Sequence, residues 1–109
     1  MRGVPGALAW VARQPAIIAA LNLTTVDHGV WLTGLLVDPA WRDKGVASAL
    51  LQRALVSSTG PVWLFCHPSL CDFYARLGFT QAHDLPPLLE QRLRRYQRSK
   101  PLLAMVREP

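Results

Sequence analysis

The sequence predicts an α/β fold of the α+β kind, built as a single domain that spans residues 1–109. Short apolar runs broken by turn residues fill the first third of the chain, and helical and strand-like patterns alternate after them. Half of the residues are hydrophobic, so a chain of about 100 residues can bury a core without disulfide bonds. Strands first and an alternation of helix and strand afterwards favour this class.

Three apolar runs open the chain and are expected to form strands joined by short turns. The runs cover residues 8–13, 17–24 and 30–37, and the turns fall at Gln14-Pro15 and at Asp27-His28-Gly29. The third run contains Gly34. An isolated glycine inside a strand often marks a bulge or a close backbone approach, so we expect one of these at Gly34.

A helix is expected from Val46 to about Ser57, because its apolar residues form one stripe. The stripe consists of Val46, Ala47, Leu50, Leu51, Ala54 and Leu55. Residues 62–66 then form a continuous apolar run, which is typical of a strand buried on both faces. A helix between two such strands implies a parallel crossover connection.

The second half of the chain predicts two more helices and two more strands. One helix begins near Ser69, whose hydroxyl is expected to cap it with Asp72 as the reciprocal partner, and ends at Gly78. Its inner face is expected to hold Leu70, Phe73, Tyr74 and Leu77. The other helix contains Leu88, Leu89, Leu93 and Tyr96 with its arginines on the solvent side, and the strands cover residues 79–82 and 102–106.

The net charge of +5 suits an anionic partner, which nucleic acid, a membrane surface or a phosphorylated cofactor would each provide. Much of this charge lies in residues 92–100, which we interpret as a solvated helix face rather than a nucleic-acid site. Cys66 and Cys71 form no CxxC pair, and with His67 they lack zinc-site spacing, so no metal is expected. Without a signal peptide or a long apolar run, the chain is expected to be cytoplasmic, with no membrane partner.

Residues 36–47 predict an anion site, because a strand ends there and a basic, glycine-bearing loop leads directly into a helix. The N–H groups of the first helical turn face the loop mouth, where Arg42 and Lys44 add positive charge. Gly45 removes a side chain that would keep an anion away from this backbone. A phosphate is the expected ligand.

Two motifs together carry a family resemblance. Val37-Asp38-Pro39 is followed by Arg42-x-x-Gly45-x-Ala47, and about thirty residues later by Phe73-Tyr74-x-x-Leu77-Gly78-Phe79. In this order the motifs resemble the GNAT superfamily of acetyl-CoA-dependent N-acetyltransferases, and residues 85–105 resemble the end of short cyanobacterial and plastid members. The resemblance implies a mixed, mostly antiparallel sheet with splayed central strands and flanking helices. The family's N-terminal strand and two helices are expected to be truncated here.

The resemblance also implies roles for individual residues. The pyrophosphate loop of coenzyme A would be Arg42, Asp43, Lys44, Gly45, Val46, Ala47 and Ser48, with Asp43 standing where most members have a second glycine. The backbone of Leu36 and Val37 would hold the pantetheine arm, and an N–H near Val37 would hold the oxyanion. Tyr74 would protonate the leaving thiolate as the general acid. His67 occupies a position where many members have an asparagine that contacts the coenzyme.

The implied function is N-acetyl transfer from acetyl-CoA, as co-substrate, to a primary amine on a small molecule or a peptide, by direct attack in a ternary complex. A non-catalytic acyl-CoA-binding or sensing module is the alternative. No general base is assigned, and the candidates are Asp27, His28, His83, Asp84 and Glu90. The acceptor groove is expected to be open or to be completed by a second subunit, which favours a homodimer.

Overall fold

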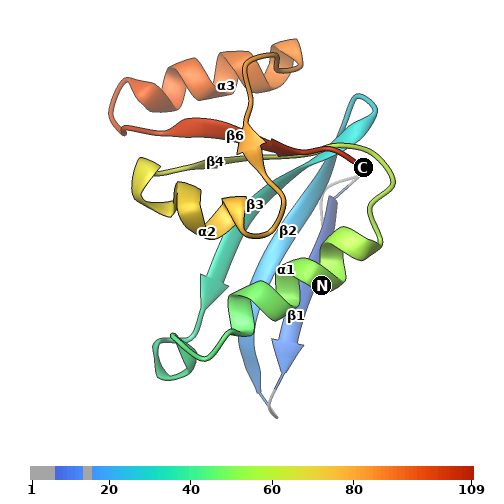
Figure 1. Cartoon of the computed structure of the whole chain (residues 1–109), viewed down its shortest axis with the longest axis vertical. Helices are drawn as coiled ribbons and strands as arrows, with labels where there is room; N and C mark the ends of the chain where they lie inside the picture. Colours follow the sequence, from blue (N-terminus) through green and yellow to red (C-terminus); the bar gives the residue numbers. More distant parts are fainter. Residues whose placement is uncertain (1–6, 14–15) are drawn as a thin grey trace.

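A computed structural model describes residues 7–13 and 16–109 and confirms the α/β class. Its six strands form one sheet in the order β1-β2-β3-β4-β6-β5 (Figure 1). The strands are β1 (Ala7–Arg13), β2 (Ile17–Val26), β3 (Gly29–Val37), β4 (Val62–Cys66), β5 (Thr80–Gln81) and β6 (Leu103–Arg107). The helices are α1 (Val46–Val56), α2 (Cys71–Ala75) and α3 (Pro87–Gln97), with 3₁₀ turns η1 (Pro39–Trp41) and η2 (Pro68–Leu70).

Strands β1, β2 and β3 are antiparallel, as the turn residues between the apolar runs predict. The predicted turn at Gln14-Pro15 lies outside the described residues. The bulge expected at Gly34 is confirmed: Asn22 pairs with Thr33 and Ala20 pairs with Leu36, so β3 has one extra residue there. Gly34 has a φ of +66°, a left-handed conformation that a residue without a side chain adopts easily.

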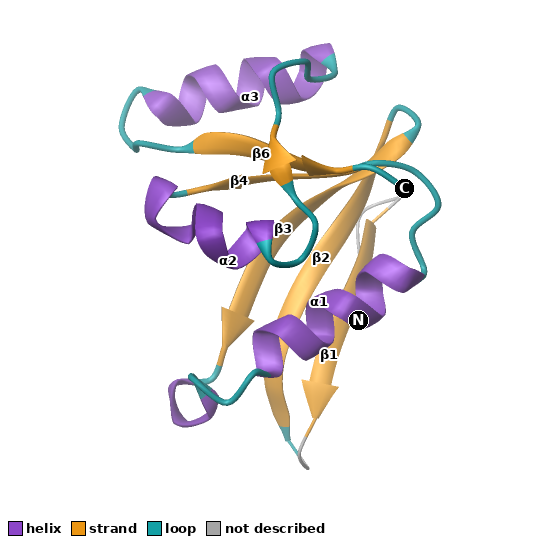
Figure 2. Ribbon diagram, in the orientation of Figure 1, coloured by secondary structure: helices purple, strands orange, loops and turns teal. Residues whose placement is uncertain are grey.

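The predicted crossover is also confirmed, because β3 and β4 are parallel and α1 joins them. Their ladder contains only two pairs, Val30 with Val62 and Trp31 with Trp63. Beyond these pairs the two strands diverge, while β4 continues to pair with β6 along its whole length (Figure 2). The gap between the ends of β3 and β4 is the splay that the family resemblance implies.

The sheet carries helices on both faces. Helices α1 and α2 pack on one face over the main core, whose large, fully buried side chains include Leu21, Leu51, Leu64 and Phe79. Helix α3 packs on the other face, where its Leu89 is completely buried and contacts Val26 and Trp63. Among the described residues, no helix is long and apolar enough to cross a membrane.

Three details of the predicted helices are wrong. The Ser69 hydroxyl does not cap α2, because it lies 2.9 Å from His67 Nδ1 and the helix begins two residues later without a side-chain cap. Leu70 is 45% exposed, since it belongs to the preceding 3₁₀ turn and not to the inner face of α2. Leu88 is 47% exposed, because one turn of α3 buries only its neighbour Leu89 against the sheet.

Candidate active site

The first part of the site is the gap between β3 and β4. After Trp31 the edge of β3 that faces β4 has no partner strand in the described structure. The side chains of Leu35 and Val37 pack against the main core, whereas Leu36 is 70% exposed on the opposite face. Backbone groups of β3 are therefore available in the gap to an extended ligand that binds through main-chain hydrogen bonds.

The second part is a cavity of about 300 Å³ at the end of β3. It contains most of the predicted loop residues, and its lining consists of Val37, Trp41, Arg42, Asp43, Gly45, Val46, Ala47, Ser48 and Phe73. Trp41 and Phe73 were not among the predicted binding residues. Trp41 could have been identified from its position inside the loop segment, and Phe73 from its position next to Tyr74.

The start of α1 supplies free donors to this cavity. The first intrahelical hydrogen bond runs from the Ala49 N–H to the Gly45 carbonyl at 3.1 Å, so the three amides of residues 46–48 precede it. No side chain caps the helix, and its first turn contains no acidic residue. These amides and the helix dipole therefore favour an anion at this point.

The loop conformation depends on two left-handed residues, Asp43 with a φ of +63° and Gly45 with a φ of +76°. A Cβ on Gly45 would meet no atom within 4 Å, so the left-handed backbone rather than crowding requires glycine. Asp43 adopts a conformation that costs energy for a residue with a side chain, although aspartate tolerates it better than most. The glycine that the family resemblance implies at position 43 would adopt the same left-handed backbone without this cost.

Hydrogen bonds hold the loop against the strand. Asp38 Oδ1 accepts from the Ala40 N–H at 2.8 Å and caps the turn η1. Arg42 Nε donates to the Val37 carbonyl at 3.4 Å. Lys44 lies outside the cavity of the loop and lines a neighbouring cavity of about 510 Å³ next to Trp10.

Tyr74 lies under the gap on the side of α1 and α2. Its side chain is 6% exposed and belongs to the same core cluster as Leu35 and Val37. The rings of Phe73 and Phe79 pack edge-on against it, with centroids at 5.0 and 5.7 Å. Burial, and secondarily the neighbouring Cys66, raises the pKa of Tyr74 to about 12, so its hydroxyl is protonated and can donate.

The cysteines and His67 lie near the end of β4. Cys66 is buried, and burial followed by the neighbouring Cys71 raises its pKa to about 11, which makes it a poor nucleophile. His67 is exposed and its Nδ1 accepts from the Ser69 N–H at 3.1 Å, so it caps η2 and does not line the loop cavity. Within the described ranges, no group of three His, Cys, Asp or Glu side chains is arranged to hold a metal ion.

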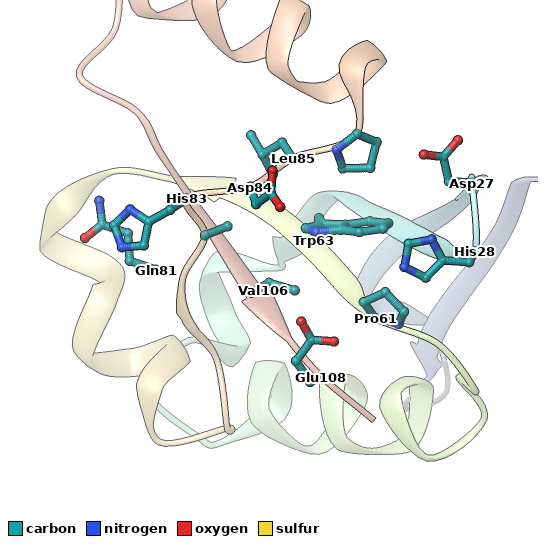
Figure 3. Close-up of a pocket in the computed structure, with 12 residues that line it drawn as sticks. Asp27, His28, Pro61, Trp63, Gln81, His83, Asp84, Leu85, Val106 and Glu108 are labelled. Atoms are coloured by element: carbon teal, nitrogen blue, oxygen red, sulfur yellow. The ribbon is translucent and has the colours of Figure 1, made fainter.

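A separate cavity of about 430 Å³ brings together four of the five candidate bases (Figure 3). It is lined by Asp27 and His28 from the turn before β3 and by His83 and Asp84 from the loop after β5, with the Trp63 ring between these two groups. It lies at the beginnings of β3 and β4, whereas the strands diverge at their ends. The fifth candidate, Glu90, is exposed and pairs with Arg94 at 2.9 Å. None of the five therefore lies in the gap.

Comparison with known proteins identifies the family. A family model for an acetyltransferase (GNAT) domain matches residues 5–81. No curated protein matches the sequence.

Three similar solved structures carry coenzyme A. N-acetylglutamate synthase from Neisseria gonorrhoeae, complexed with coenzyme A and N-acetyl-glutamate, is 17% identical with a TM-score of 0.73 over 87% of this chain. Rv2747 from Mycobacterium tuberculosis, in complex with CoA, is 18% identical with a TM-score of 0.72 over 93%. The PaiA N-acetyltransferase from Thermoplasma acidophilum, in complex with coenzyme A, is 16% identical with a TM-score of 0.70 over 95%.

These structures show the fold of the chain. The chain spans 24% of the length of the synthase, 75% of Rv2747 and 62% of the PaiA enzyme. The family model, in contrast, matches well over half of the chain and covers both the loop cavity and Tyr74. The chain therefore belongs to the GNAT acetyltransferase family, a family of acyltransferase enzymes.

Proposed function

We propose that the protein transfers acetyl from acetyl-CoA to a primary amine by direct attack in a ternary complex. The observation that carries this proposal is the placement of the loop cavity at the end of β3, next to the diverging strands and to Tyr74. The loop would bind the phosphates, the gap would hold the extended pantetheine arm, and the buried Tyr74 hydroxyl would lie at the thioester. These three parts of the site thus lie in the same order as the corresponding parts of acetyl-CoA. The complexes of the three similar structures with coenzyme A support the choice of ligand.

The binding roles follow from this placement. The amides of residues 46–48 and the Arg42 guanidinium would hold the pyrophosphate, and Lys44 would add positive charge from outside the cavity. The backbone of Leu36 and Val37 would bind the pantetheine arm as if it were an added strand. His67, at the end of β4, would be a further contact at the edge of the site.

The chemical step requires an electrophile, an acid and a neutral amine. The amine nitrogen attacks the thioester carbonyl carbon, and a β3 backbone N–H near Val37 stabilises the oxyanion. As the carbon–sulfur bond breaks, the Tyr74 hydroxyl gives its proton to the thiolate. The burial that raises the pKa of Tyr74 also raises that of a thiol in the same place, so the proton transfer stays close to balanced. The proton of the amine leaves through water.

An acetyl-CoA thiol-release assay over a panel of amines and peptides, run beside a thermal-shift titration with coenzyme A, tests the proposal. Saturable stabilisation by coenzyme A together with thiol release from at least one amine is the expected result. Stabilisation without thiol release from any amine would instead favour an acyl-CoA-binding or sensing module. An absence of both would overturn coenzyme binding itself.

We also propose a homodimer in the cytoplasm. Apolar side chains on the outer strands are exposed, including Leu8 at 66%, Ile17 at 49% and Val11 at 41%, and a second subunit would cover them. The two cysteines are free, which suits a reducing compartment. Size-exclusion chromatography with light scattering checks the dimer, and a monomer at micromolar concentration would contradict it.

A further inference from the structure

Only one face of the gap between β3 and β4 is open to an acceptor. On the face of α1 and α2, the side chains of Leu35, Val37 and Tyr74 fill the space as part of the main core. On the face of α3, the exposed Leu36 side chain borders the gap instead. An acceptor amine must therefore approach the acetyl group from the face of α3, and the groups on that face decide which amines bind.

Two aromatic rings form the floor of this face where the strands begin to diverge. Trp31 belongs to the last pair of the β3–β4 ladder, and Phe65 lies on β4 beyond that pair. Their ring centroids are 5.5 Å apart, so the two side chains touch across the beginning of the gap. Helix α3 crosses above them, as its Tyr96 ring lies 6.2 Å from Phe65.

A guanidinium without a counter-ion lies above this floor. The central carbon of Arg92, on α3, is 5.2 Å from the Trp31 ring centroid, in a cation–π arrangement. Its neighbour Arg94 pairs with Glu90, whereas Arg92 is exposed and has no hydrogen bond or ion pair with any described residue. Arg92 thus lies on the solvent side of the helix, as predicted, and its guanidinium also contacts an aromatic ring of the sheet.

The indole beneath Arg92 adds a second donor without a partner. Trp31 Nε1 is buried and has no hydrogen-bond acceptor within the described part of the chain. Buried N–H groups are rarely left unpaired in folded proteins, and an unpaired one calls for a missing partner such as water or a ligand. The exposed guanidinium thus offers donors and positive charge, and no described carboxylate pairs with it.

We propose that Arg92 binds a carboxylate of the acceptor, so that the preferred acceptors are peptides whose acidic side chain lies on the order of 15 Å from the reacting amine, because Trp31 and Val37 are six residues apart along β3. The proposal rests on the proposed function, because the gap must hold acetyl-CoA for this face to be the acceptor side. A guanidinium matches the two oxygens of a carboxylate with two parallel hydrogen bonds, and the cation–π contact with Trp31 favours its position over the ring. Arg92 is thus a specificity residue that contacts the acceptor away from the reacting nitrogen.

Matched pairs of amines test this proposal. A peptide with glutamate at its fifth position is compared with the same peptide carrying glutamine there, and likewise with aspartate and asparagine, by calorimetric titration in the presence of coenzyme A and by thiol release from acetyl-CoA. The member with the carboxylate is expected to bind about tenfold to a hundredfold more tightly. Arg92→Gln should remove this preference by weakening the binding of the carboxylate member, while Arg92→Lys should keep only part of the preference. Arg98→Gln, which removes the same charge at the end of the same helix, should keep the preference.

Several outcomes would overturn the proposal. Equal binding of both members of each pair would do so, and so would a preference that survives in Arg92→Gln. Tighter binding of a peptide with phosphoserine at that position than of the glutamate peptide would assign the site to phosphate instead of carboxylate. Because the titrations need no turnover, they judge this proposal even where thiol release fails. Failure of the proposed function would appear separately, as the absence of thiol release from every amine or the absence of stabilisation by coenzyme A.

Discussion

The loop of residues 42–48, for which we propose coenzyme binding, and the Tyr74 site lie next to each other, but they are made of different parts of the chain. Residues 42–45 of the loop are exposed, and the free donors are the backbone amides of the adjoining residues 46–48. Tyr74 is buried, and its ring packs against the rings of Phe73 and Phe79. Changes in the loop should therefore alter coenzyme affinity, and changes at Tyr74 should alter turnover.

The largest effect is expected from Tyr74→Phe, which removes the acid and keeps the ring packing. Turnover should fall by about a hundredfold or more, because general acid catalysis contributes at least that much. The coenzyme dissociation constant should remain nearly unchanged. Tyr96→Phe, which removes the same atom from an exposed ring on α3, is the control and should keep wild-type turnover.

Steady-state kinetics and a coenzyme A titration measure both quantities for Tyr74→Phe. Unchanged turnover would remove Tyr74 from the mechanism. A weaker coenzyme A affinity with unchanged turnover would mean that Tyr74 contributes to coenzyme binding and not to the chemical step.

A second prediction concerns stability at high pH. Burial raises the pKa of Cys66 from 9.0 to about 11 and that of Tyr74 from 10.0 to about 12. The unfolded chain loses these protons at lower pH than the folded chain, so the free energy of unfolding is unaffected by these groups below pH 9. It should fall by on the order of 5 kcal/mol as the pH rises from about 9 to 12.

Urea unfolding followed by circular dichroism at pH 8, 10 and 11 checks this fall. Tyr74→Phe should show a shallower decline, because only Cys66 still contributes. An equal decline in both proteins would mean that the Tyr74 hydroxyl is not as desolvated as its burial indicates.

The third prediction sharpens the description of the loop. Gly45→Val should weaken coenzyme A binding by about tenfold, because a left-handed conformation costs about 1–2 kcal/mol for a residue with a Cβ and a branched side chain also crowds the amides. Gly45→Ala separates the two causes, since its Cβ would meet no protein atom within 4 Å and only the backbone cost remains.

Isothermal titration with coenzyme A measures the affinity of both Gly45 variants. If they bind as tightly as the wild type, the loop does not contact the ligand through its backbone.

The smallest effect on coenzyme A affinity is expected from a change at Asp43, which should strengthen binding instead of weakening it. Asp43→Gly should improve coenzyme A affinity severalfold, because it relieves a left-handed backbone and removes a carboxylate from a phosphate site. Asp43→Asn removes the charge and keeps the side chain, so the difference between the two variants isolates the backbone contribution. A loss of affinity in Asp43→Gly would assign Asp43 a positive role in binding.

Features that depend on neighbours along the chain were predicted correctly. The apolar runs, the bulge at Gly34, the stripe of α1 and the left-handed conformation of Gly78 all follow from local spacing and backbone preference, although α2 ends three residues before Gly78, at Ala75. The cap expected from Ser69 failed for a local reason too. His67 Nδ1 accepts from the Ser69 N–H and its ring meets the Ser69 hydroxyl, so a 3₁₀ turn forms where the helix was expected to begin.

Features that join distant segments could not be predicted in the same way. Arg92 lies over the Trp31 ring, although sixty residues separate the two in the sequence. A helix pattern alone indicates only that such an arginine lies outside the core. The cavity that gathers Asp27, His28, His83 and Asp84 likewise joins a turn before β3 to a loop after β5. Their separation in the sequence gives no sign of this.

The sequence by itself determined the family and predicted the roles of the loop and of Tyr74, because each of the two motifs is encoded within a few adjacent residues. The tertiary structure decided where β3 and β4 part, which face of the gap is filled by core, and which arginine lies over the open face. The physical reason is that strand divergence and side-chain stacking depend on packing between segments far apart in the chain. Local preferences do not specify such contacts.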